Sequence, residues 1–477
     1  RGACSGKKEV QFIDKYPEIY PDYTDVAIPF NIAPLNFMIT DSGERLEVKI
    51  KGKYEELTEK GAYKISFPVV RFHNLLNKHK GDSLQIQVFA KKAGGWKQYK
   101  LFYWYVTPEK IDPFLTYRLI EPGYEVYNNL SIRQRNITNF DEKVLADNNL
   151  TDKGCMNCHI TNKHQPEQSF FHIRHKKGGT IIAQGEKLRK LNTSTDQTLS
   201  AGVYGNWHPS GRFIAFSTNV IIPEFYSMMD KRMEVYDTVS DLMVLDINKN
   251  QVFSAPEIAR PDKLESFPEF SADGKKLFFC VADTVTLPEN YKQLKYSLCS
   301  VGFNADTRTF DNNVDTLFSS QIENKTVSLP KASPDGRYLM FSVFDYGTFP
   351  IWHSEAVLYN LDLSTGELNK LPIVNEKKYS NSYHSWSSNN RWFVFASKRD
   401  NGMYGKPYFS YINENGEESK PIVLPQKDPE IYDYFYKSFN IPELLEHETG
   451  FNAIDVERVF EKEEAEKVKF IDTRQHN

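Results

Sequence analysis

The sequence predicts an all-β protein: an N-terminal Ig-like β-sandwich, then a β-propeller of about six blades, then a short helical tail. Aromatic residues make up 14% of the 477 residues, and aromatic side chains favour strands. Alternating apolar segments, followed by repeated units of a turn and a strand, fill most of the chain. The formal net charge is only -4, so no strongly basic surface is expected and nucleic acid is excluded as a partner.

The first part of the chain divides into a tether and a sandwich. Residues 1–23 are expected to form an extended N-terminal tether. Over residues 24–110, apolar residues alternate with charged or amide ones, as at Leu46, Val48 and Ile50 and again at 84–88. Period two places the apolar side chains on one face of a strand, and glycine-containing clusters at 41–43 and 93–95 supply turns. Several such strands within about ninety residues predict a small β-sandwich.

Residues 111–425 are expected to form the propeller. Four related segments each combine a tight polar turn with an apolar strand, at 207–217, 270–280, 332–342 and 386–396. Gly211, Gly274 and Gly336 are spaced by 63 and 62 residues, and Asn390 takes the same place 54 residues later. Repeats of this size built from short strands are typical of propeller blades. Five or seven blades are the alternatives to six.

The tail, residues 426–477, is expected to be helical. Asp428-Pro429 resembles a helix start, with a capping residue followed by proline. Aromatic residues then recur at helical spacing, at Tyr432, Phe435, Tyr436 and Phe439. We expect this face to pack on the rest of the protein, and a helix that docks to a partner is the alternative.

The pentapeptide Cys155-Met156-Asn157-Cys158-His159 is a C-x-x-C-H motif, which is typical of covalent haem attachment. Cys155 and Cys158 would add to the two vinyl groups of the haem, and His159 would be the proximal ligand of the iron. The motif falls within residues 141–178, which are expected to form an irregular loop of the propeller. One covalent haem c is therefore the expected cofactor.

A distal haem ligand is expected among the histidines that follow the motif. His172 is preferred, because Phe171 and Ile173 beside it supply the apolar surroundings that a porphyrin requires. His208 is the second choice, although it occupies a turn position that is commonly structural. His175 is the third choice, and a five-coordinate iron would need no distal ligand.

Zinc is the main alternative to haem. Cys155, Cys158, His172 and His175 give the spacing C-x2-C-x13-H-x2-H, which is close to that of a Cys2His2 zinc finger. The last spacing is short, since three to five residues usually separate the two histidines. A site without any cofactor, holding a disulfide or an unloaded motif, is the third possibility.

Cys4 is expected to carry a lipid. Small residues precede it in Gly2-Ala3-Cys4, as they do at the end of a lipoprotein signal peptide, and a free surface cysteine is the alternative. The sequence contains no run of eighteen apolar residues, the length that a membrane-spanning helix needs. Attachment to the membrane would therefore depend on this lipid anchor.

The chain resembles the TolB-like β-propeller lipoproteins of Gram-negative bacteria, some of which carry a single C-x-x-C-H motif. The resemblance covers nearly the whole chain and rests on the haem motif together with residues 20–26, 31–37, 116–124, 171–174 and 207–211. It implies a propeller in the cell envelope, as an outer-membrane lipoprotein. Lys7 and Lys8 near Cys4 favour an anchor that faces the periplasm. The resemblance implies no particular reaction.

The expected function is that of an envelope-anchored c-type haem protein that transfers electrons in the periplasm to a protein redox partner. The alternative is a non-redox propeller scaffold within an outer-membrane complex. A hydrolase of the propeller-plus-peptidase kind is disfavoured, because such enzymes need a large α/β domain and only about fifty residues follow the last blade. The sequence therefore predicts no enzymatic activity.

Overall fold

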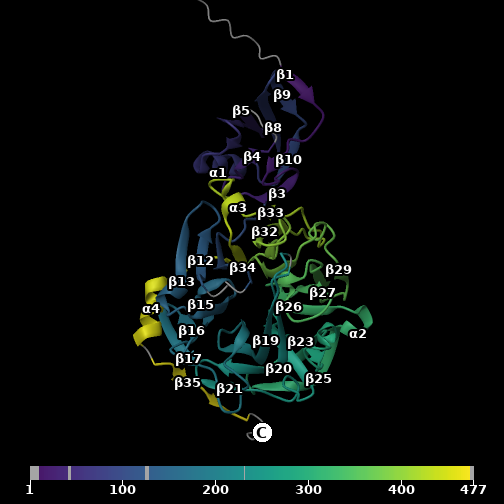
Figure 1. Cartoon of the computed structure of the whole chain (residues 1–477). Helices are drawn as coiled ribbons and strands as arrows, with labels where there is room; N and C mark the ends of the chain where they lie inside the picture. Colours follow the sequence, from purple (N-terminus) through teal and green to yellow (C-terminus); the bar gives the residue numbers. More distant parts are fainter. Residues whose placement is uncertain (1–9, 41–43, 124–127, 230, 463, 473–477) are drawn as a thin grey trace, which may run out of the picture. The chain divides into compact units, whose positions relative to one another are not determined.

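The computed structural model describes residues 10–40, 44–123, 128–229, 231–462 and 464–472 (Figure 1). Strands dominate the described residues, and their α-helices are few and no longer than ten residues, which confirms the all-β class. None of these helices has the length and apolar character that a membrane crossing requires.

The chain forms two compact units. The first comprises Arg1–Pro113, Asn136–Asp141 and Tyr408–Phe435, and the second comprises Phe114–Arg135, Glu142–Pro407 and Tyr436–Asn477.

The first unit contains a seven-stranded sheet and a three-stranded sheet. The larger has the order β1-β9-β8-β10-β3, with β5 beside β8 and β6 beside β5. The pairs β1–β9 and β10–β3 are parallel, and the other pairs in this sheet are antiparallel. Its strands are β1 (Val10–Ile13), β3 (Val26–Pro29), β5 (Arg45–Lys51), β6 (Glu56–Gly61), β8 (Ser83–Lys92), β9 (Gly95–Tyr99) and β10 (Phe102–Thr107). The smaller sheet consists of β2 (Ile19–Tyr20), β4 (Phe37–Ile39) and β7 (Lys64–Ile65).

A helix that the sequence analysis did not anticipate covers part of this unit's core. In α1 (Val69–Lys78), Phe72, Leu75 and Leu76 recur at helical spacing and are buried. The ring of Phe72 lies 6.0 Å from that of Trp104 in an edge-on arrangement. Trp104 is fully buried, and its indole N–H donates to the carbonyl of Tyr23 at 2.7 Å, so its one polar atom is satisfied.

Six further sheets follow one another along the chain. They are β11–β13 with β34, β14–β17, β18–β21, β22–β25, β26–β29 and β30–β33, and the C-terminal strands β35 and β36 add to the second and third of them. The strands are β11 (Phe114–Ile120), β12 (Ser131–Asn136), β13 (Glu142–Asp147), β14 (Cys155–Asn162), β15 (Gln165–Arg174), β16 (Gly179–Gln184), β17 (Lys187–Asn192), β18 (Val203–Trp207), β19 (Phe213–Phe225), β20 (Met233–Asp246), β21 (Gln251–Phe253), β22 (Lys263–Phe270), β23 (Lys276–Asp283), β24 (Ser297–Asn304), β25 (Thr309–Phe318), β26 (Thr326–Ala332), β27 (Tyr338–Phe344), β28 (Val357–Asp362), β29 (Leu368–Asn369), β30 (Asn381–Trp386), β31 (Trp392–Ser397), β32 (Lys406–Tyr411), β33 (Ile422–Val423), β34 (Ser438–Leu445), β35 (Glu466–Lys467) and β36 (Lys469–Phe470). The remaining α-helices are α2 (Ser320–Glu323), α3 (Ile431–Tyr434) and α4 (Ala453–Lys462).

The repeated turns of the sequence connect the first two strands in four of these sheets. In the turn before β27, the Ser333 hydroxyl donates to Asp335 Oδ1 at 2.6 Å and accepts the N–H of Tyr338 at 2.9 Å. Ser271 and Ser387 make the same pair of bonds in the turns before β23 and β31. We call these three the serine turns. The same local chemistry thus builds the same turn each time.

A second repeat lies in the strands themselves. Each of six strands is interrupted at one residue with a positive φ, and the register with the neighbouring strand shifts close to that point, as in a β-bulge. We call these six strands the inner strands, and the six residues the bulge residues. They are Cys158 in β14, Tyr204 in β18, Phe267 in β22, Leu329 in β26, Tyr383 in β30 and Ile441 in β34, with φ between 48° and 62°.

Two expectations about local structure are wrong. Residues 141–178 do not form a loop, since β13, β14 and β15 lie there and the C-x-x-C-H motif starts the inner strand β14. The tail is not simply helical, because α3 ends at Tyr434 and β34 follows at Ser438. Phe439 pairs with Leu119 of β11, more than 300 residues earlier, so this long-range pairing overrides the local helical spacing of the aromatic residues.

Candidate active site

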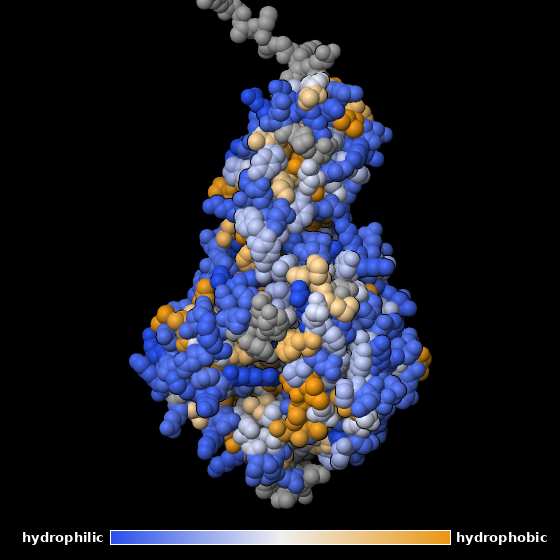
Figure 2. All heavy atoms as spheres, viewed as in Figure 1, coloured by the Kyte–Doolittle hydropathy of each residue, from blue (hydrophilic) through white to orange (hydrophobic). Residues whose placement is uncertain are grey.

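A cavity of about 760 Å³ lies among the inner strands, entirely within the second unit. All six bulge residues line it, and so do the residues two positions further along each inner strand, which are Ile160, Asn206, Glu269, Lys331, Ser385 and Glu443. The volume suits a small ligand, and the wall combines aromatic rings with a few polar groups. On the face drawn in Figure 2, most residues are hydrophilic and a cluster of hydrophobic ones interrupts them.

The C-x-x-C-H motif contributes Cys155, Cys158 and His159 to the wall of this cavity. Cys158 packs among Phe170 and Trp207, and its sulfur accepts the backbone N–H of Tyr204 in β18 at 3.2 Å. Cys155 packs instead against a different cluster, which includes Met156. His159 is buried near β11 and β34, where burial lowers its pKa to about 3 and the nearby charge of Arg118 acts in the same direction.

The covalent haem c and its ligands Cys155, Cys158 and His159 stay predictions. Covalent attachment needs both thiols to reach the edges of one porphyrin while the adjacent imidazole reaches its iron. Cys158 is the bulge residue of β14, and its sulfur accepts the N–H of Tyr204 in β18, while His159 also lies beside β11 and β34. The burial that surrounds Cys158 also raises the pKa of its thiol.

The other predicted ligands are held in separate places. His172 is buried with its Nδ1 3.2 Å from Thr180 Oγ1, and burial lowers its pKa to about 4, with the charge of Arg174 acting in the same direction. The ring of His175 lies beside that of Phe460 of α4. His208 sits in the turn before β19, with its Nδ1 2.7 Å from Ser210 Oγ and its Nε2 3.1 Å from the carbonyl of Gly274. The structure does not bring a distal ligand to the motif, and it does not gather the four residues of the predicted zinc site. Among all described residues, no group of three or more His, Cys, Asp or Glu is placed to hold a metal ion.

Glu443 of β34 is the most unusual acid in the cavity wall. Its side chain is only 9% exposed, and its Oε1 accepts both the N–H and the hydroxyl of Thr161, at 2.9 and 2.8 Å. Its Oε2 is buried without a hydrogen-bond partner among the described residues. Burial raises the pKa of Glu443 to about 7, although the bonds from Thr161 favour the ionised form. The carboxyl is therefore poised to take up or release a proton near neutral pH.

Other ionisable groups line the same cavity, among them Glu269, Lys331, His384 and Lys398. Glu269 is bound by the Lys331 amine at 3.0 Å and by the N–H of Ala332 at 3.1 Å, so this pair is held in place. His384 has its Nε2 2.9 Å from the carbonyl of Met340, and burial lowers its pKa to about 3. Burial also lowers the pKa of Lys398 well below its usual range, and its Nζ has no hydrogen-bond partner within the described residues. Several groups with shifted pKa values in one cavity are typical of a catalytic site.

Comparison with known proteins gave no match to a family model or to a curated protein. Among solved structures, the chain is similar to an oligogalacturonate lyase from Vibrio parahaemolyticus, with a TM-score of 0.38 and 10% identity, over 65% of this chain and 79% of that one. A puromycin-hydrolyzing peptidase from Mycobacterium tuberculosis gives a TM-score of 0.37 and 10% identity, over 73% and 52% of the two chains. Prolyl oligopeptidase B from Galerina marginata gives a TM-score of 0.35 and 8% identity, over 87% of this chain and 62% of that one. The chain thus spans little more than half the length of these two peptidases. At such scores the comparisons assign no reaction.

The predicted function needs correction in two respects. The haem-binding electron carrier is wrong, because no group of three or more His, Cys, Asp or Glu among the described residues is placed to hold a metal ion. The alternative of a non-redox scaffold, and with it the absence of enzymatic activity, is also wrong. The cavity gathers the titratable groups that catalysis uses. The TolB-like resemblance, the envelope location and the envelope partners stay predictions, and the predicted lipidation site Cys4 lies outside the described residues.

The sequence analysis missed the residues that now matter most. Glu443 stands in a tail that was expected to be helical, and Glu269 and Lys331 directly follow prolines, which seldom occur in strands. One signal was available. The inner strands repeat a pattern of bulge residue, then glycine, proline or histidine, then a variable residue, as in Phe267-Pro268-Glu269, Leu329-Pro330-Lys331 and Ile441-Pro442-Glu443. This pattern precedes the turns by a few residues.

Proposed function

We propose that the six sheets are the blades of a β-propeller, and that the first unit is an appended Ig-like β-domain. Six consecutive sheets, each with an equivalent bulge on its inner strand and all lining one cavity, support the propeller. The pairing of β34 with β11 joins the end of the chain to the first sheet, as closure of a propeller ring requires.

We propose further that the protein is a hydrolase whose active site is the cavity among the inner strands, with Glu443 as its general base. The observation that carries this proposal is the state of the Glu443 carboxyl. One oxygen is fixed by Thr161, the other has no partner among the described residues, and the pKa is about 7. A base is most effective when its pKa lies near the working pH.

The thiol of Cys158 does not supply the nucleophile. The Cys158 sulfur accepts a backbone N–H, and burial raises the pKa of the thiol, so little thiolate forms at neutral pH. Water is therefore the nucleophile in this proposal. Glu443 Oε2 takes a proton from the water as the water oxygen bonds to the electrophilic carbon of the substrate. The bond to the leaving group then breaks, and the leaving group takes the same proton from Glu443, which restores the carboxylate.

A comparison of the protein with its Glu443→Gln variant tests this mechanism. Both would be incubated in water enriched in oxygen-18 with a panel of oligosaccharides and short peptides, and the products would be weighed by mass spectrometry. Hydrolysis places one heavy oxygen in a product. We expect Glu443→Gln to lose at least about 100-fold in rate, because it removes the base. Glu448→Gln is the matched control, since Glu448 lies on the same segment, is 58% exposed and pairs with Lys143.

Three outcomes would overturn the proposal. Cleavage that incorporates no heavy oxygen would make the protein a lyase that eliminates without water. Equal rates for the protein and Glu443→Gln would remove the proposed base. Failure of every substrate in the panel to be cleaved would count against hydrolysis of these two classes. Circular dichroism of each variant shows that a lost rate does not come from a lost fold.

A further inference from the structure

Arg118 lies in the middle of β11, where that strand faces the bulge of β34. Its side chain is only 8% exposed and lines the cavity. Nη1 donates to the carbonyl of Met156 at 3.2 Å and to Asn157 Oδ1 at 2.7 Å, both on β14. Two bonds from one nitrogen hold the guanidinium plane, so its position in the cavity wall is fixed.

The remaining nitrogens of this guanidinium are not used by the protein. Nε is buried and has no hydrogen-bond partner, and Nη2 donates to no group within the described ranges. The two groups that Arg118 does bind are neutral. Other arginines of the same unit have a carboxylate partner instead, as in Arg212 with Asp246 at 2.8 Å and Arg260 with Glu265 at 2.9 Å.

A buried cation without an anionic partner is costly, and a ligand that supplies the anion removes that cost. Nε and Nη2 form one edge of the guanidinium, and such an edge matches the two oxygens of a carboxylate. In the same cavity wall, the indole N–H of Trp207 and the amine of Lys398 likewise have no acceptor among the described residues, while Glu443 Oε2 and His384 Nδ1 are acceptors without a donor.

We propose that Arg118 binds a carboxylate of the substrate, so that the cavity takes small acidic molecules. This inference rests on the proposed function in naming the substrate class of the same site. The carboxylate lies on the Nε–Nη2 edge, and the rings of Tyr204, Phe267 and Tyr383 offer surfaces for the rest of the molecule. Arg118 thereby acts as a binding residue that distinguishes an acid from its neutral analogue.

Calorimetric titration with two pairs of probes tests the inference without any need for turnover. The pairs are glucuronate with glucose, and N-acetylglutamate with N-acetylglutamine, and each pair differs chiefly in one carboxylate. We expect at least one acid to bind about 10-fold or more tightly than its neutral analogue, since a charge-assisted pair contributes roughly 1.5–3 kcal/mol. Arg118→Gln should remove this preference. Arg118→Lys should keep only part of it, because an amine lacks the two parallel N–H donors with which a guanidinium binds a carboxylate.

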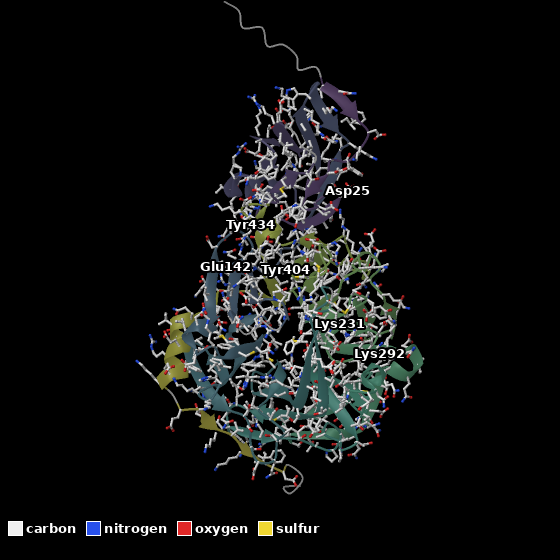
Figure 3. All side chains as sticks on the ribbon, viewed as in Figure 1. Asp25, Glu142, Lys231, Lys292, Tyr404 and Tyr434 are labelled. Atoms are coloured by element: carbon white, nitrogen blue, oxygen red, sulfur yellow. The ribbon has the colours of Figure 1, made fainter. Side chains whose placement is uncertain are left out.

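Arg133→Gln is the matched control. Arg133 belongs to the neighbouring strand β12, lies outside the cavity wall and pairs with Glu142, which is labelled in Figure 3. We expect this variant to keep the preference of the unmodified protein. If an Arg118 variant does not fold, the unmodified protein alone still tests the inference through the ratio of its affinities for each acid and its neutral analogue. Equal affinities would overturn the inference.

The two proposals can fail separately. Glu443→Gln should keep the preference for the acid while losing turnover, because Glu443 is not the carboxylate-binding group. An acid preference with no hydrolysis would support the binding site and refute the hydrolase. Retention of the preference in Arg118→Gln, or tighter binding of inorganic phosphate than of either acid, would overturn the assignment to Arg118 and to carboxylates.

Discussion

The serine turns and the inner strands are both repeated from sheet to sheet, yet they differ in what is repeated. In the turns, the side chains themselves recur, and Ser271, Ser333 and Ser387 make the same two bonds. In the inner strands only the backbone recurs. The bulge residues share a positive φ but include a thiol, two phenols and three apolar side chains. Repeated side chains therefore mark the scaffold, and varied side chains on a repeated backbone mark the site.

The largest effect is expected from Gly274→Ala in a turn. Gly274 has a φ of +74°, and an added Cβ would lie 2.3 Å from the His208 ring, which is itself packed against Phe213, Phe270 and Phe303 and cannot easily move. The left-handed backbone and the overpacking together should lower the free energy of unfolding by about 3 kcal/mol, measured by urea denaturation. Gly366→Ala, with a φ of +75° and open space around it, should lose only about 1 kcal/mol. Equal losses would show that His208 does not constrain the turn.

An intermediate effect is expected from Glu443→Gln in an inner strand, and it depends on pH. The folded pKa of about 7 exceeds the ordinary glutamate value of 4.5, so the folded protein keeps a proton that the unfolded chain releases between these values. The carboxyl thus contributes stability that is fully present below pH 4.5 and is lost as the pH rises through 7. Between about pH 4.5 and 8, the unmodified protein should lose about 2 kcal/mol more than the variant. Urea unfolding at several pH values measures this difference, and parallel curves for the two proteins would contradict the raised pKa.

The smallest effect is expected from Ser333→Ala. The change removes a donor to Asp335 and leaves the N–H of Tyr338 without its acceptor, so the unfolding free energy should fall by about 1 kcal/mol. Ser271→Ala should cost a similar amount in the preceding sheet, and the double variant should show the sum, since among the described residues no hydrogen bond joins Ser271 or Asp273 to the turn of Ser333. Thermal unfolding of the three variants tests this, and a double variant no weaker than either single one would contradict independent turns.

The strand class and the turns could be predicted because their causes are local. Alternation in β5 and β8 buries Val48, Ile86 and Val88 on one face, and the turn residues carry their own hydrogen-bond partners within five positions. The inner strands could not be recognised in the same way. Proline and a residue of positive φ interrupt them, and both normally argue against a strand.

The candidate site was missed for a related reason. Cys155, Cys158 and His159 match a haem motif by their spacing along the chain, but a haem also requires that they converge in space. That convergence depends on whether the segment is a loop or a strand, and here β14 pairs with β15. Glu443 and Arg118 become neighbours in one cavity wall only through the pairing of β11 with β34, which no local pattern indicates.

That pairing has a consequence for how the protein is made in the cell. A ribosome produces Arg118 early and Glu443 more than 300 residues later, and β34 completes the first sheet only after β11 to β33 have been synthesised. An unfinished or truncated chain that lacks β34 would hold most of the scaffold but not the proposed base. Under the proposed function, the order of synthesis delays assembly of the site until nearly the whole chain has left the ribosome.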